Sequence, residues 1–99
     1  MIINQTHLPL EDRFDFLEDA KRKVAERGEE YGTVAENFGK TAAIWSAILD
    51  QDVTPGQVAL CMAGLKIARL TYDSQDEDGW ADLAGYAACG GEVTRGDDV

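Results

Sequence analysis

The chain has 99 residues and is 44% hydrophobic, which fits one small domain with a limited core. Nineteen Asp and Glu residues outnumber nine Lys and Arg residues, giving a formal net charge of -10 at pH 7. This charge argues against direct nucleic-acid binding, because an acidic surface repels phosphate. It suits a soluble protein, a divalent-metal binder, or an acidic decoy for a basic surface of another protein.

No signal peptide is predicted, because the chain does not open with a basic region followed by an apolar core. No apolar run approaches the roughly 20 residues that a membrane span needs. We therefore expect a cytoplasmic protein without membrane contact, in the host cytoplasm if a phage encodes it. Cys61 and Cys89 are expected to be small buried hydrophobes with free thiols, because no CxxC pair or His/Cys cluster indicates zinc.

Helical periodicity without strand-type alternation predicts an all-α, four-helix bundle-like domain. Residues 1–8 are expected to form a flexible lead, residues 9–91 the single helical domain, and residues 92–99 an acidic tail. Helices in so short a chain can leave apolar faces uncovered, so a homo-oligomer is expected.

The first two helices are predicted from their ends. A helix is expected to begin near Pro9 or Leu10, because Pro suits a first turn, and Gly28 is expected to end or loosen it. The second helix is expected to start after Thr33, an N-cap whose capping box is completed by Glu36.

The third helix has the clearest start signal in the chain. Thr54, Pro55 and Gln57 suit the N-cap, N1 and N3 positions, and the helix is expected to run to about residue 72. Residues 58–65 are apolar or small all round, so this helix is expected to be the central and most buried one.

The fourth helix is predicted over residues 78–89 and is expected to stop at the glycines 90–91. Its acidic first turn suits a helix N-terminus. The side chains expected to be buried on it are Trp80, Leu83, Ala84 and Ala87.

Two carboxylates of this acidic stretch are candidate metal ligands. Asp78 and Asp82 are four residues apart, so a helix projects them from one side, and they repel each other unless a cation lies between them. This arrangement favours Mg²⁺, with Glu36 as a candidate third ligand. The alternative is a solvated acidic first turn, and the capping box explains Glu36 equally well.

Lys66 and Arg69 are candidate phosphate ligands near the end of the third helix. The alternative pairs them with carboxylates across the hairpin or with the helix dipole. Asn37 and Tyr31 are further candidates for substrate binding, and the two interpretations of Tyr31, stacking on a base or packing in the core, stay open. No nucleophile arrangement is available, because His7 stands alone, so an enzyme here would use metal-activated water.

Several stretches resemble a family of small uncharacterised phage and prophage proteins. They are RGEEYG (27–32), ENF (36–38), WSAIL (45–49), VTP (53–55), VALCMA (58–63), LKIARL (65–70) and DLAGYA (82–87). The match covers about residues 24–92. The Lys-x-x-Arg helix followed by an acidic helix is also distantly similar to the MazG-like all-α nucleotide pyrophosphohydrolases. Those enzymes use paired Glu and a Glu-x-x-Asp to bind Mg²⁺, where this chain has Glu29-Glu30 followed by Tyr-Gly, and Asp78-x-x-x-Asp82.

The resemblance implies a Mg²⁺-dependent nucleotide-binding protein, with possible cleavage of a nucleoside triphosphate between its α and β phosphates. Its expected residues are Glu36, Asp78 and Asp82 on the metal, and Lys66, Arg69, Asn37 and Tyr31 on the substrate. The alternative is a non-catalytic phage anti-defence protein. It would sequester a nucleotide signal, or inhibit a host nucleic-acid-binding defence protein with its acidic surface. A structural helical oligomer is the third interpretation.

Overall fold

The computed structural model describes residues 9–95, most of which belong to four α-helices. In chain order these are α1 (Arg13–Tyr31), α2 (Val34–Leu49), α3 (Pro55–Tyr72) and α4 (Glu77–Val93). The predicted all-α class and the four helices are confirmed. The predicted lead, residues 1–8, and residues 96–99 of the predicted tail lie outside the described residues. Residues 92 and 93 of that tail belong to α4.

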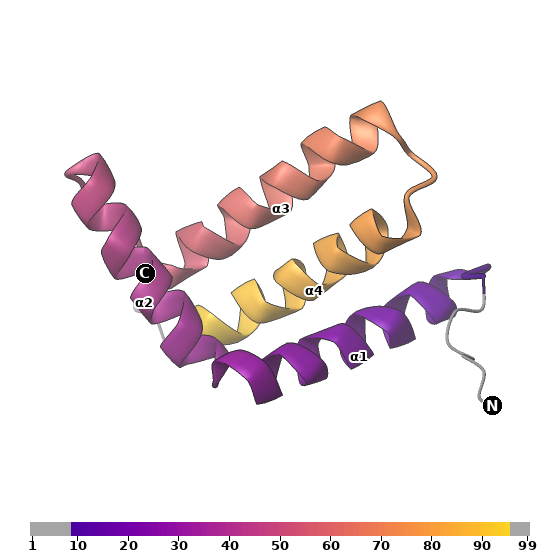
Figure 1. Ribbon diagram of the computed structural model, residues 1–99, viewed down its shortest axis with the longest axis horizontal. Coiled ribbons are helices and arrows are strands. Elements are labelled where there is room, and N and C mark those ends of the chain that lie inside the picture. The colour runs from indigo at the N-terminus through magenta and orange to yellow at the C-terminus, as the bar shows by residue number, and fades with distance from the viewer. Residues whose placement is uncertain (1–8, 96–99) are drawn as a thin grey trace.

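Three helices run side by side, with α4 between α1 and α3 (Figure 1). α3 and α4 form an antiparallel hairpin, and α1 runs in the same direction as α4. α2 crosses the end of these helices where α1 stops and α3 starts, and then projects beyond them. The molecule is therefore elongated, with extents of 48, 30 and 24 Å.

Capping determines where α1 begins and ends. Asp12 and Asp15 form a capping box, so α1 starts later than the prediction near Pro9 or Leu10. Gly28 lies inside the helix, where the sequence predicted its end. The helix stops instead before Gly32, whose φ of 91° lies in the region that favours glycine.

The predicted starts of α2 and α3 are confirmed. The backbone N–H of Glu36 donates to the Thr33 hydroxyl over 3.1 Å, and the Thr33 backbone N–H donates to Glu36 Oε1 over 3.0 Å. Thr54 and Gln57 make the same reciprocal pair. These short-range signals are complete in the sequence, which is why the starts are predicted correctly.

The central helix is α4, so the prediction that α3 is central and most buried is wrong. α4 packs against each of the other three helices. No helix formed by residues 9–95 covers the outer side of α3, where Leu60 is 73% exposed and Cys61 is also exposed. The expectation that both cysteines are buried is therefore confirmed only for Cys89.

α4 also presents a different face to the protein than predicted. Trp80 is 44% exposed and its indole N–H donates to the Ser74 carbonyl, and Ala87 is exposed. The helix continues through Gly90, where an added Cβ would lie only 3.0 Å from the Ala59 Cβ. The glycine therefore allows a close approach of α3 and α4 instead of ending the helix. The residues that α4 buries are Gly79, Ala81, Asp82, Gly85 and Cys89.

The apolar core lies where α2 meets α3 and α4. Its buried members are Phe38, Ala42, Val58, Ala59 and Cys89. The Phe38 and Tyr86 rings lie 6.5 Å apart between centroids. The far half of α2 leaves Ile44, Ile48 and Leu49 exposed, and the expected homo-oligomer stays a prediction. None of the helices formed by residues 9–95 is long and apolar enough to cross a bilayer.

Candidate functional site

Asp82 is a charged residue buried in the protein. It is 8% exposed and lies on the part of α4 that is enclosed by α1 and α3. Its Oδ2 lies 3.0 Å from Lys66 Nζ on α3. Its Oδ1 lies 3.7 Å from Lys23 Nζ and 3.6 Å from Arg27 Nη2, both on α1. One carboxylate thus faces three cations, which offsets part of the cost of burying its charge.

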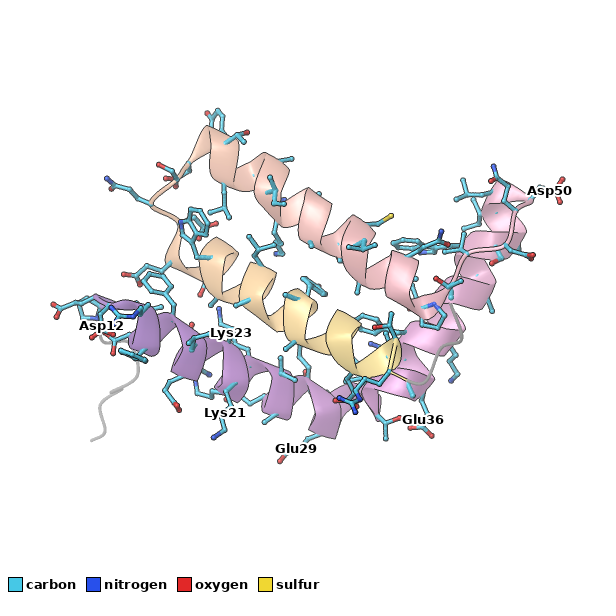
Figure 2. The ribbon with its side chains drawn as sticks, turned by 180° about the vertical axis from the view of Figure 1, so that it is seen from behind. Asp12, Lys21, Lys23, Glu29, Glu36 and Asp50 are labelled. Atoms are coloured by element: carbon cyan, nitrogen blue, oxygen red, sulfur yellow. The ribbon has the colours of Figure 1, made fainter. Side chains whose placement is uncertain are left out.

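The helical spacing explains this convergence. Lys23 and Arg27 are four residues apart, so α1 presents both from one side. Figure 2 shows Lys23 directed toward α4, whereas Lys21 points away from the protein. Lys66 approaches the same carboxylate from α3, so Asp82 links both neighbours of the central helix.

Lys23 is held by further carboxylates. Its Nζ lies 2.6 Å from Asp78 Oδ1 and 3.5 Å from Asp19 Oδ2. Burial disfavours the ammonium form, but the hydrogen bond that Lys23 donates to Asp78 and the charges of Asp82, Asp78 and Asp19 together raise the Lys23 pKa. Lys23 therefore stays charged at neutral pH.

The Oδ1 atom of Asp82 is buried and accepts no hydrogen bond from residues 9–95. The contacts to Lys23 and Arg27 exceed 3.5 Å and are too long to be hydrogen bonds. A buried acceptor without a donor costs about 1–3 kcal/mol. The two α1 cations offset part of this cost electrostatically, and Oδ1 itself is closed off from the surrounding space.

A pocket of about 340 Å³ opens beside this carboxylate. This volume lies within the range of small-molecule sites. Much of its wall is apolar and comes from Val24, Val34, Phe38, Val58 and Met62. Its polar wall includes Lys23, Arg27, Asn37, Thr41 and Asp82. Such a pocket combines a surface for a planar apolar body with a few groups that fix its orientation.

The structure brings together some of the predicted substrate and metal residues. Tyr31, Asn37 and Asp82 all line the pocket. Lys66 contacts Asp82 but is not among the residues that line it. Arg69 is exposed near the end of α3 and does not line it either.

The three predicted metal ligands do not gather at one point. Among residues 9–95, no three His, Cys, Asp or Glu side chains are grouped to hold a metal ion. Hydrogen bonds from the Thr33 backbone and hydroxyl lower the pKa of Glu36, which lies at the exposed start of α2 (Figure 2). Asp78 and Asp82 share the Lys23 ammonium. The three residues therefore do not form a common ligand set among residues 9–95, and the expected Mg²⁺ stays a prediction.

Sequence reasoning missed three residues of the site. Lys23 and Arg27 were not assigned to it, although their spacing of four on one helix was a signal for a shared side. Tyr86, which lines the pocket, was noted only within a motif. Lys23 and Arg27 could not be connected to Asp82 without knowing that α1 packs against α4, whereas Tyr86 lies one turn after Asp82 on α4, and this spacing of four was a signal for a shared side.

The two thiols are expected to react at different rates. Cys61 is exposed, whereas burial and the nearby Glu92 raise the pKa of Cys89, which also lines the pocket. Because the thiolate is the reactive form, Cys89 should react at least about tenfold more slowly with a disulfide reagent at pH 8. Cys61→Ser should leave only the slow phase. Equal rates for both thiols in the wild-type protein would contradict the buried position of Cys89.

Comparisons with known proteins place the chain among phage relatives. A family model described as "Domain of unknown function (DUF6378)" matches residues 15–94. The chain is 38% identical over 74 residues to the Gene 55 protein of Mycobacterium phage D29, covering 74% of this chain and 49% of that protein. It is 38% identical over 63 residues to the Gene 55 protein of Mycobacterium phage L5, covering 63% of this chain and 40% of that protein.

This chain therefore spans about half the length, or less, of the curated relatives it matches. No solved structure matches it. The predicted resemblance to phage proteins is confirmed by these relatives, and the more distant resemblance to MazG-like enzymes stays a prediction.

Proposed function

The chain belongs to the DUF6378 family, and from its pocket we propose that it binds a nucleotide or a nucleotide-derived small molecule. The observation that carries this proposal is a largely apolar pocket of about 340 Å³ whose wall also includes the cationic side chains of Lys23 and Arg27. A nucleotide combines a flat apolar ring bearing N–H donors with a phosphate that an arginine binds well.

We propose binding without turnover as the first form of this function. The positive and negative charges around Asp82 are equal in number. The cations Lys23, Arg27 and Lys66 contact the carboxylates Asp19, Asp78 and Asp82. An uncompensated cluster of carboxylates would instead support a divalent ion. Sequestration of a nucleotide signal, the non-catalytic alternative, is compatible with this charge balance. Hydrolysis assisted by Mg²⁺ is the competing proposal.

A thermal-shift screen of ribonucleotides and deoxyribonucleotides, with and without Mg²⁺, tests the proposal. A ligand at 100 times its Kd should add about 2.7 kcal/mol to the free energy of unfolding. We expect at least one nucleotide to raise the melting temperature, equally well in EDTA. If no nucleotide changes it under either condition, nucleotide binding is refuted.

The same protein should be assayed for pyrophosphate release with Mg²⁺. Binding without release supports sequestration. Release that disappears in Asp78→Asn, but not in Glu36→Gln, would instead support a metal at the start of α4. The Glu36→Gln variant is a suitable control, because glutamine also completes a capping box.

A further inference from the structure

We infer that a second copy of this chain binds to the outer side of α3 and the far half of α2, with the two α3 helices antiparallel. This α2–α3 surface comprises residues 43–49 and the exposed side of α3 at Leu60, Gly64, Ile67 and Ala68. The inference is independent of any ligand in the pocket, and it gives the expected homo-oligomer a defined interface.

The α2–α3 surface exposes large apolar side chains. Ile48 and Leu60 are each 73% exposed, and Ile44 and Leu49 are each 58% exposed. Figure 1 shows α2 projecting past the start of α3 on the side of α3 that faces away from α4. Both helices therefore border the same side of the molecule. An exposed apolar patch of this kind marks an interaction surface in a soluble protein.

The distribution of the carboxylates selects another copy of this chain as the partner. All 19 Asp and Glu residues lie outside residues 37–49 and 53–72, which include the far half of α2 and all of α3. Two copies that each carry a charge of -10 repel each other over most of their surfaces. They can meet at the α2–α3 surface without placing carboxylate against carboxylate. A basic partner would instead be attracted to the carboxylates of α1 and α4.

Gly64 lies at the middle of α3 and is exposed. A Cβ added there would meet no neighbouring atom of the described chain within 4 Å. Glycine is less favourable than alanine inside a helix, and the contacts within residues 9–95 give no reason for it at this position. A close approach of a second helix would give one, as Gly90 allows between α3 and α4.

The charges at the two ends of the surface favour antiparallel α3 helices. Arg69 lies near the end of α3, whereas Asp50 and Asp52 lie in the connection before its start. Among residues 9–95, none of these three side chains forms an ion pair. Parallel helices would place each charge beside its own copy. Antiparallel helices bring the Arg69 end of one copy toward the acidic connection of the other, twice in a two-fold dimer.

The surface is long enough for a stable dimer. α3 has 18 residues, which makes it about 27 Å long. A typical specific interface buries roughly 800 Å² per partner, a patch roughly 28 Å across. The far half of α2 adds the width that a single helix does not supply.

Sedimentation equilibrium on the intact chain tests the interface. The chain mass is 10.8 kDa, and we expect twice this mass at the upper end of a series from about 1 µM to 1 mM. A single chain mass over the whole series overturns the inference, and the α2–α3 surface would then belong to a different protein.

Gly64→Glu places a carboxylate at the centre of the interface on each copy. It should weaken dimerisation by at least about 100-fold, because like charges in contact are strongly unfavourable. Gly28→Glu is the matched control and should leave the dimer unchanged. Gly28 is also an exposed helical glycine with open space around an added Cβ, but it lies on α1 outside the α2–α3 surface.

Circular dichroism checks that both glycine variants fold. If Gly64→Glu does not fold, Leu60→Ser replaces it, since a side chain that is 73% exposed contributes little to the fold of one chain. A folded Gly64→Glu or Leu60→Ser variant that dimerises as tightly as the wild-type chain overturns the proposed surface.

A charge exchange tests the orientation of the helices. Arg69→Glu should weaken the dimer by about tenfold, because it brings a carboxylate toward Asp50 and Asp52. Adding Asp52→Arg to the same chain should restore most of the lost affinity. If Arg69→Glu has no effect, or if Asp52→Arg does not rescue it, the antiparallel arrangement is overturned.

Discussion

Asp82→Ala is expected to lower the free energy of unfolding by about 3 kcal/mol, measured by urea denaturation at pH 7. Removing one partner of a buried ion pair costs about 3–5 kcal/mol, because it leaves charges without compensation. The lower end applies here, since Lys23 and Lys66 each keep 16% of their side chains exposed and can turn partly to water.

Asp78→Ala is the control for this experiment. Asp78 lies one turn earlier on α4 and also contacts Lys23, but its side chain is 73% exposed. Exposed ion pairs contribute about 0–1 kcal/mol, so the control should lose little. Equal losses in the two variants would contradict the central position of Asp82 between the helices.

Phe38→Ala should cost about 3 kcal/mol in the free energy of unfolding, the level typical of a phenylalanine removed from a core. Phe38 is 8% exposed and belongs to the core cluster where α2 meets α3 and α4. It also lines the pocket, so the same variant should lose affinity for any ligand that binds there.

Phe14→Ala is the matched substitution on the surface. Phe14 is 58% exposed, with the Arg13 guanidinium 4.5 Å from its ring centroid. This contact contributes about 0.5–1 kcal/mol at an exposed site, so the loss should stay near that value. A loss in Phe38→Ala no greater than in Phe14→Ala would contradict the described packing of α2.

The parts of the fold predicted correctly depend on neighbours in the sequence. The capping boxes after Thr33 and Thr54 involve residues three apart, and both helix starts are confirmed. The predicted end at Gly28 is wrong because a single glycine costs a helix only about 1 kcal/mol, which packing can offset. The prediction that α3 is the central and most buried helix was also wrong, because burial depends on which helix lies between the others.

The candidate site was likewise predicted only in part: some of its residues were identified from the sequence, but not their neighbours in the fold. Asp82 and Lys66 were singled out from their charges and spacing, and they lie 3.0 Å apart. Their assigned roles as metal and phosphate ligands depended on neighbours that the sequence could not supply. Arg27 and Tyr86 are 59 residues apart in the chain and line one pocket. Such a pairing arises only from the packing of α1 against α4.

The two oxygens of Asp82 make the central helix an electrostatic link between its neighbours. Oδ2 contacts Lys66 on α3, while Oδ1 faces the cations on α1. A shift of this one side chain therefore changes the ion pairs with both helices. A molecule in the pocket that draws Arg27 away from Oδ1 would weaken the attraction between α1 and α4, while the Lys66 contact still holds α3. Occupancy of the pocket would then register as altered amide exchange along α1, far more than along α3.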